Sequence, residues 1–323
     1  MAGKVEEAEA IHSEMVESLY EEMFRIRVFE SLLVPHIQSG EIKTPCHLCI
    51  GQEAVAVGVC KALKPQDYVF GNHRSHGHYL AKGGDMRALA CEIFGKAEGC
   101  SRGYGGSMHI CDPAVNFMGS ASIVGGTIGL AVGAAMAAKL RGEDRVSVAF
   151  FGDGATNEGV FYESMNIARL YNLPVIFVCE NNGYSTHMKV NDCLSSQPYL
   201  IAEGLGYDAH CIDGNDPLSV YQAVALARSW ALTRVQPRFV ECTTYRLCGH
   251  VGPNDNVAGQ QTDIRPEAEV KEAWRREPLA NWSNFTPMVK AGEIYNEIAE
   301  IIEYARKADY PEKGSYKKHV FAD

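Results

Sequence analysis

Long hydrophobic runs are missing from this chain of 323 residues, and so is any excess of positive charge. The longest apolar stretches, such as residues 146–151, have the length of a strand, whereas a membrane span needs about 20 apolar residues. Lys and Arg number 30 against 40 Asp and Glu, so the net charge of −10 argues against a nucleic-acid partner. The first residues lack the apolar segment of a signal peptide, which predicts a cytoplasmic chain or one in an organelle matrix.

Several common ligand-binding signatures are also absent. There is no Gly-x-x-x-x-Gly-Lys-Ser/Thr phosphate loop, and the glycines at 103, 105 and 106 do not follow a strand as Gly-x-Gly-x-x-Gly, which argues against a nicotinamide site. Cys46-His-Leu-Cys49 has no second pair at zinc-ribbon spacing, so packing is favoured over zinc. The 11 cysteines are scattered and odd in number, which predicts free thiols in a reducing compartment.

Alternating strands and helices in the second half predict an α/β fold, with a parallel sheet flanked by helices on both faces. The strands lack polar alternation, as strands covered on both faces do. Strands are expected at 145–151, 174–180 and 238–244, with helices at 157–172 and 219–233. A single domain over residues 1–323 is expected, with a helical N-terminal extension to about residue 40 and a helical C-terminal region over about 265–323.

The first half predicts helices of several kinds. Apolar residues at helical spacing predict a long helix over 6–34, with Pro35 as its stop and its apolar face favoured as core over a subunit contact. The uncharged, small-residue stretch 125–138 predicts a deeply buried helix. Further helices are expected at 53–62, 85–94 and 290–308, with loops at 100–109 and 250–267.

Polar side chains follow two neighbouring strands of the expected sheet. Gly152-Asp153-Gly154 comes directly after one buried strand, and Asn181-Asn182 directly after the next. Because neighbouring parallel strands end at one edge, about 4.8 Å apart, Asp153 and Asn182 are expected to converge. Carboxylate and amide oxygens suit Mg²⁺, and a helix N-terminus nearby favours a diphosphate. Gly-Asp-Gly alone is more typical of a turn with Asp as its cap, and the Asn pair shifts the interpretation towards a metal site.

This Gly-Asp-Gly and Asn-Asn pair resembles the motif of thiamine-diphosphate enzymes, and five further segments narrow the resemblance. In chain order they are His47-Leu-Cys-Ile-Gly-Gln-Glu-Ala54, His73-Arg-Ser-His-Gly77, Gly105-Gly-Ser-Met-His109, Ile123-Val-Gly125 and Thr244-Tyr-Arg-Leu-Cys-Gly-His250. Together they are similar to the alpha subunit of the thiamine-dependent, decarboxylating component of 2-oxo acid dehydrogenase complexes. Pyruvate, branched-chain 2-oxo acid and acetoin dehydrogenases share this subunit type. The likeness covers about residues 15 to 310 and implies a thiamine-diphosphate-binding fold.

The resemblance implies a role for each matching residue. The Mg²⁺ ligands would be Asp153, Asn182 and the backbone carbonyl of Tyr184. The diphosphate contacts would be Gly154, Ala155, Arg74 and His73, and the backbones of Ser122 and Val124 would touch the aminopyrimidine. The catalytic candidates are His76 and His250, near the diphosphate and the reacting centre, and His47, facing the substrate carboxylate.

Two departures from the family pattern bear on substrate and control. His73 stands where the pyruvate enzymes typically carry Tyr. Val251 follows His250 where mitochondrial pyruvate enzymes carry a phosphorylatable Ser, so that form of kinase control is expected to be absent. The loop after His250 is longer than in the pyruvate enzymes, which leaves the substrate open between a 2-oxo acid, with pyruvate favoured, and acetoin.

The resemblance also implies partners. Family members form α₂β₂ heterotetramers with the cofactor between subunits, the beta subunit supplies a carboxylate at the pyrimidine, and the acyl group passes to a lipoyl-bearing acyltransferase. This chain alone is therefore expected to be inactive. The alternatives are a thiamine-dependent decarboxylase or carboligase without a lipoyl partner, and a non-catalytic scaffold. The presence of Asp153, Asn182, Arg74 and His250 together argues against the scaffold.

Other histidines admit plainer interpretations. His73, His76 and His78 lie close together in the sequence, and beside Arg74 an anion site is favoured over a metal cluster. His109 is as consistent with a loop hydrogen bond as with an active-site role.

Overall fold

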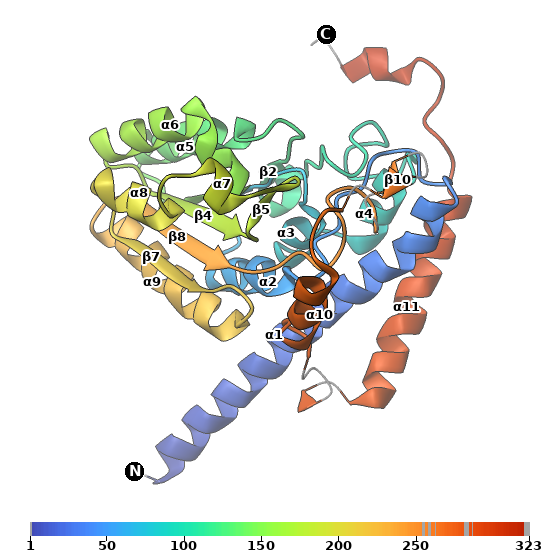
Figure 1. The fold of residues 1–323 in the computed structure, drawn as a ribbon, viewed down its shortest axis with the longest axis horizontal. Helices are drawn as coiled ribbons and strands as arrows, with labels where there is room; N and C mark the ends of the chain where they lie inside the picture. Colours follow the sequence, from blue (N-terminus) through green and yellow to red (C-terminus); the bar gives the residue numbers. More distant parts are fainter. Residues whose placement is uncertain are drawn as a thin grey trace.

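A six-stranded parallel sheet forms the centre of the molecule in the computed structural model, which describes residues 2–253, 256–257, 260–261, 263–280, 284–285 and 287–319 (Figure 1). In spatial order the strands are β2 (Phe117–Gly119), β1 (Tyr68–Phe70), β3 (Ser147–Gly152), β4 (Val175–Asn181), β8 (Arg238–Thr243) and β7 (Ala209–Asp213). Every neighbouring pair is parallel. The expected fold class is confirmed, and β3, β4 and β8 are the three strands that the sequence predicts.

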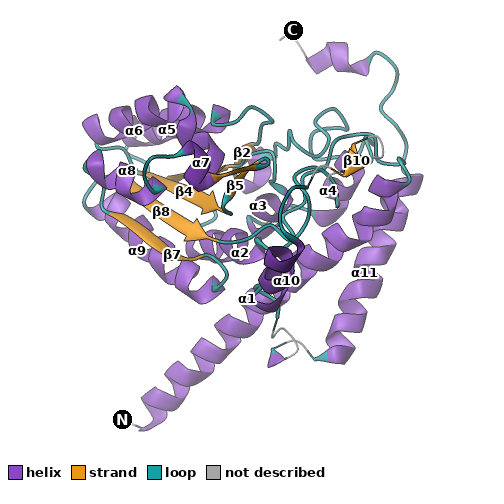
Figure 2. Cartoon of the chain, in the orientation of Figure 1, coloured by secondary structure: helices purple, strands orange, loops and turns teal. Residues whose placement is uncertain are grey.

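Helices cover both faces of this sheet (Figure 2). One face is covered by α5 (Gly126–Leu140), α6 (Gly159–Leu170) and α8 (Pro198–Gly204), and the other by α2 (Glu53–Ala62) and α9 (Pro217–Thr233). Successive side chains of a strand point to opposite faces. Accordingly Phe151 and Phe177 are buried among α5, α6 and α8, whereas Phe150 and Val178 are buried against α2 and α9. Two separate cores therefore hold the carboxyl ends of β3 and β4 in place.

A long N-terminal helix, α1 (Ala2–Gln38), lies beside the C-terminal helix α11 (Met288–Lys307) in Figure 1. Leu19, Met23 and Phe29 of α1 are fully buried within the chain, which confirms the interpretation of this apolar face as core. The expectation that Pro35 stops the helix is wrong, because the helix continues to Gln38. Proline removes only its own N–H, and its carbonyl still accepts a hydrogen bond from Ser39 N at 2.9 Å.

The expectation of deep burial for the small-residue helix is also wrong. One face of α5 packs on the sheet through residues such as Ile128 and Ala135, but the opposite face is open, with Leu130 61% exposed. The lack of charged residues in most of α5 therefore reflects both a buried face and an exposed face that is uncharged.

The remaining elements are short. The helices are α3 (His76–Ala81), α4 (Met86–Ile93), α7 (Val190–Cys193) and α10 (Glu267–Arg275), with 3-10 turns at Pro113–Val115, Asp153–Asn157 and Ser315–His319. Two hairpins pair β5 (Tyr184–Ser185) with β6 (Met188–Lys189) and β9 (Asn256–Val257) with β10 (Gln260–Gln261). The region expected as a loop over 250–267 thus contains a hairpin, and its residues 254–255, 258–259 and 262 lie outside the described ones. None of the described helices is long and apolar enough to cross a membrane.

All 11 cysteines are free thiols, as expected. Both Cys46 and Cys49 are buried, and burial raises the pKa of the Cys46 thiol to about 12. A buried, protonated thiol packs as a small apolar group, which agrees with the preference for packing over zinc at this pair.

Candidate functional site

A cavity of about 150 Å³ opens at the carboxyl ends of β3 and β4. This is the edge where open α/β sheets bind their ligands. All but one of the predicted site residues line it. They are His47, His73, Arg74, Ser122, Val124, Asp153, Gly154, Ala155, Asn182, Tyr184 and His250.

His76 is the exception. Its ring is fully buried, with Nδ1 2.9 Å from Glu30 Oε1 and Nε2 2.8 Å from the hydroxyl of Ser107. Both ring nitrogens are therefore engaged inside the protein, and the structure does not bring His76 into the cavity.

The convergence of the two strand ends agrees with the register of the sheet. Gly152 of β3 pairs with Glu180 of β4, so Asp153 and Asn182 follow at the same edge. The Asp153 side chain is buried, and among the described residues its Oδ2 has no hydrogen-bond partner. Burial raises the pKa of this carboxyl to about 6, against the opposing effects of backbone hydrogen bonds and of Arg246.

Asn182 is held by its neighbours. Its Nδ2 donates to Gln52 Oε1 at 3.3 Å, and its Oδ1 accepts from the backbone N–H of Tyr184 at 3.1 Å. A Cβ at Gly154 would come 2.4 Å from the hydroxyl oxygen of Ser185 and 3.1 Å from its Cβ, so any side chain here would force Ser185 to move. The backbone at this point can therefore be approached closely, as phosphate-binding loops require.

Arg74 is a buried cation at the cavity wall. Its guanidinium donates to the backbone carbonyls of Leu48 and of His250, the latter at 3.2 Å. Burial lowers its pKa below the usual value, but an arginine remains charged in proteins. Arg74 thus ties two loops together and leaves a fixed positive charge beside the cavity.

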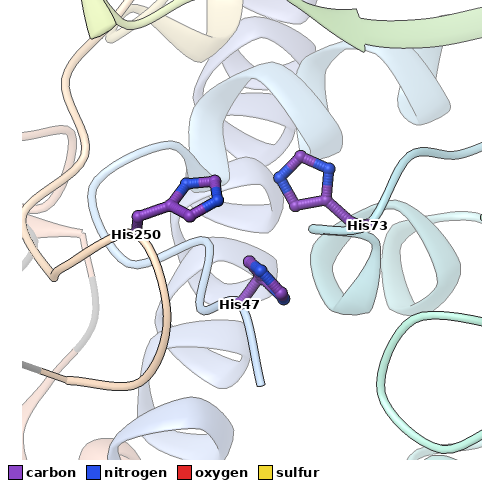
Figure 3. A group of neighbouring side chains, drawn as sticks. All are labelled: His47, His73 and His250. Carbon is purple, nitrogen blue, oxygen red and sulfur yellow. The ribbon is translucent and has the colours of Figure 1, made fainter. Parts of the chain in front are cut away.

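Three of the residues that line the cavity are histidines from separate segments, and Figure 3 shows their rings close to one another. The ring centroids of His47 and His73 are 4.7 Å apart, those of His47 and His250 5.1 Å, and those of His73 and His250 5.5 Å. Burial, with help from the Arg74 charge, lowers the pKa of His47 and of His250 to about 3 and that of His73 to about 2. All three rings are therefore neutral at neutral pH.

His78 and His109 have plainer surroundings. His78 Nε2 lies 3.1 Å from Glu180 Oε1, and its ring stacks on Phe150. Together with the internal pairing of His76, this shows that the three histidines of residues 73–78 do not form one cluster. His109 is exposed and lies within hydrogen-bond distance of Gly105 O and of the Ser122 hydroxyl, which favours the loop role.

Sequence reasoning missed several residues that line the same cavity. Arg246 is fully buried and donates to Thr186 O at 3.1 Å, and Glu180 accepts from Asn72 at 3.2 Å. Both stand inside segments already singled out, but residue spacing does not show which side chain of such a segment points inward. The other missed lining residues with polar side chains are Gln52, Asn72, Thr127, Ser185 and Thr186.

The glycine-rich loop beside the cavity is held by one carboxylate. Glu92 Oε1 accepts the backbone N–H groups of Gly105 and Gly106, and Oε2 accepts those of Ser101 and Gly103, all within 3.0 Å. This arrangement places Met108 at the cavity wall.

Comparison with known proteins identifies the class. The family model described as "Dehydrogenase E1 component" matches residues 21–308, and the chain belongs to this family. Enzymes of this family depend on thiamine diphosphate. The family that the sequence motifs predict is thus confirmed.

The chain resembles the alpha subunits of two kinds of enzyme over most of its length. The chain is 37% identical to the alpha subunit of acetoin:2,6-dichlorophenolindophenol oxidoreductase from Bacillus subtilis, over 93% of this chain and 90% of the relative. It is 36% identical to the alpha subunit of the pyruvate dehydrogenase E1 component from Porphyra purpurea, over 94% of this chain and 92% of the relative. The corresponding Zymomonas mobilis subunit is also 36% identical, over 90% of this chain and 84% of the relative.

Proposed function

We propose that this chain is the alpha subunit of a thiamine-diphosphate- and Mg²⁺-dependent 2-oxo acid dehydrogenase, with pyruvate as the favoured substrate. The observation that carries the proposal is the buried Asp153 beside Asn182 at the ends of β3 and β4. A carboxylate oxygen that is buried without a hydrogen-bond partner is costly, and a divalent cation would compensate it.

The residues at this edge fit the cofactor. Asp153, Asn182 and the Tyr184 carbonyl would hold Mg²⁺, and the Gly154 and Ala155 backbone with Arg74 and His73 would hold the diphosphate. The two buried guanidinium groups of the cavity, Arg74 and Arg246, complement a polyanion. When bound, thiamine diphosphate supplies the electron sink for cleaving the bond next to a carbonyl.

The chain's own side chains would then orient the substrate. The neutral ring of His47, with one buried nitrogen that lacks a partner among the described residues, would donate or accept a hydrogen bond at the substrate's polar groups. His250 would do the same from the opposite loop, and the backbones of Ser122 and Val124 would position the aminopyrimidine. His76, which is closed off by Glu30 and Ser107, would act only through its neighbours.

The size of the cavity favours a second subunit. Binding sites for molecules of the size of thiamine diphosphate enclose roughly 300 Å³ or more, whereas the cavity in this chain encloses about 150 Å³. We infer that a beta subunit completes the site in an α₂β₂ assembly, and that a lipoyl-bearing acyltransferase receives the acyl group. The purified chain with cofactor and Mg²⁺ should therefore turn over no 2-oxo acid, and sustained turnover by the chain alone would contradict this.

Acetoin is the second candidate substrate, because relatives named for acetoin and for pyruvate are equally similar to the chain, at 36–37% identity. The test is dye-linked oxidation by the complex purified through a tag on this chain. Pyruvate, 2-oxobutyrate, branched 2-oxo acids and acetoin are supplied separately with thiamine diphosphate and Mg²⁺, and omission of the cofactor is the control. Reduction with pyruvate supports the proposal, and reduction with acetoin alone replaces it by the second candidate.

Labelling of a lipoyl domain by the substrate then separates a dehydrogenase from a decarboxylase or carboligase. Transfer of the acyl group to the lipoyl domain supports the proposed partner. Product formation without such transfer would assign a non-oxidative reaction to the same site.

A further inference from the structure

The three histidines that line the cavity have the composition of a transition-metal site. One nitrogen from each of His47, His73 and His250 lies within 4.8 Å of the other two, and Figure 3 shows the rings around a common space. In a tetrahedral zinc site with bonds of about 2.0–2.1 Å, nitrogens lie about 3.4 Å apart. Small rotations of the rings, which move each nitrogen by about an ångström, would therefore bring the three nitrogens to the spacing of a zinc site.

The ring nitrogens are available. The His47 side chain is more than nine-tenths buried, and its Nδ1 has no partner among the described residues. None of the described hydrogen bonds engages a ring nitrogen of His73 or His250. A buried nitrogen without a hydrogen bond is costly, so a ligand at this position would be stabilised.

The backbone beneath the histidines is already fixed. Arg74 follows His73 and donates to the carbonyls of Leu48, next to His47, and of His250. The N–H of Gly252 also donates to Cys46 O at 2.7 Å. The three segments are thus held by supporting hydrogen bonds, which is the arrangement that a metal site needs around its ligands.

We propose that His47, His73 and His250 bind a late first-row dication such as Zn²⁺ or Co²⁺ when the cofactor is absent. Three neutral imidazoles suit these ions and not Mg²⁺, which prefers oxygen. The nearby charges of Arg74 and Arg246 oppose a bare dication, so the fourth ligand is an anion such as hydroxide. Under the proposed function, His73 and His250 also contact the diphosphate, so ion and cofactor compete.

Co²⁺ is the probe, because its absorption distinguishes nitrogen and oxygen ligands from thiolates. The metal-stripped full-length chain is titrated with Co²⁺, and the same titration is made with His73→Phe and His47→Phe, each checked for folding by circular dichroism. We expect one Co²⁺ per chain with visible bands and no intense near-ultraviolet thiolate band. Each variant should bind at least about tenfold more weakly, a loss comparable to that for disturbed metal sites.

His210→Gln is the matched control, because it removes an exposed histidine on β7, away from the cavity. The metal site would be overturned if both phenylalanine variants bound Co²⁺ as tightly as the wild type. A thiolate band, or no Co²⁺ binding by the wild type, would also overturn it. Weaker Co²⁺ binding on addition of thiamine diphosphate and Mg²⁺ supports the competition. The competition is measured with the chain assembled with its beta subunit. Cofactor binding that leaves the Co²⁺ affinity of this complex unchanged overturns the competition. Failure of the complex to bind the cofactor overturns the proposed function, while the Co²⁺ spectrum still reports on the histidines.

Discussion

Replacement of Asp153 by Asn should separate the stability of the empty chain from its ability to bind Mg²⁺ and thiamine diphosphate. Burial raises the pKa of Asp153 from 3.8 to about 6. A difference of about two pH units corresponds to about 3 kcal/mol by which the charged carboxylate disfavours the folded chain at pH 7. Asn has nearly the same shape and no charge, so it removes this cost.

The free energy of unfolding is expected to rise by about 1–3 kcal/mol. The lower values apply if the amide group, which replaces one acceptor oxygen with a donor, finds no partner. For a chain of 323 residues, this rise in free energy corresponds to a rise in melting temperature of about 1.5–4.5 °C. The assay is thermal unfolding at pH 7, first of the cofactor-free chain and then of the chain assembled with its beta subunit, with and without thiamine diphosphate and Mg²⁺. The assembled wild type should be stabilised by the additions, and the assembled Asp153→Asn variant should not respond to them. The exposed Asp144→Asn serves as the control for loss of a negative charge.

The same carboxyl sets the pH dependence. Because its folded pKa is raised, the folded chain binds a proton between pH 3.8 and about 6 that the unfolded chain does not hold. The charged Asp153 carboxylate therefore lowers the free energy of unfolding by its full amount above pH 6, and this loss disappears as the pH falls towards 4. The difference in stability between Asp153→Asn and wild type should shrink over that range. A variant that is less stable than wild type at pH 7, or that still responds to cofactor and Mg²⁺, would refute the reasoning.

Three further predictions concern the frame of the site and are measured by chemical unfolding. Glu92→Gln should lower the free energy of unfolding by about 3 kcal/mol, because two of the four N–H groups that its carboxylate accepts would face an amide NH₂; an unchanged value would contradict this. Gly51→Ala should lower the free energy of unfolding more than Gly40→Ala. Both glycines have positive φ, but only at Gly51 would a Cβ meet a backbone oxygen, that of Tyr245, at 2.5 Å. Phe177→Ala should cost about 3–5 kcal/mol, because the ring is fully buried between the sheet and its helices; a loss below about 1 kcal/mol would refute the packing.

Much of the sheet was predictable because its central strands are long and uniformly apolar. β3 and β4 are buried on both faces, and this leaves an unbroken apolar run in the sequence. The strands β2, at one edge, and β1, next to it, have only three residues each, too few to show a period, and β7 at the other edge is partly exposed. Such strands form because a neighbour supplies their hydrogen bonds, and that neighbour is distant in the chain.

Pro35 and α5 show the limits of local rules. A proline near the end of a helix costs one hydrogen bond, and burial of the preceding turns around Phe29 and Leu33 outweighs it. An uncharged helix can be buried or can present an apolar surface, and composition does not distinguish the two. Only the packing of α5 on a single face of the sheet shows that Leu130 is exposed.

The sequence by itself determined the α/β class, the family and the strand ends that carry Asp153 and Asn182, because these depend on short-range patterns and on motifs of fixed spacing. Only the tertiary structure decided which side chains of those motifs enter the cavity. It excludes His76, which pairs with Glu30 and Ser107, and adds Glu180 and Arg246. It also brings His47, His73 and His250 together from three distant loops. The physical reason is that burial and hydrogen-bond partners are set by segments far apart in the chain, which no local pattern records.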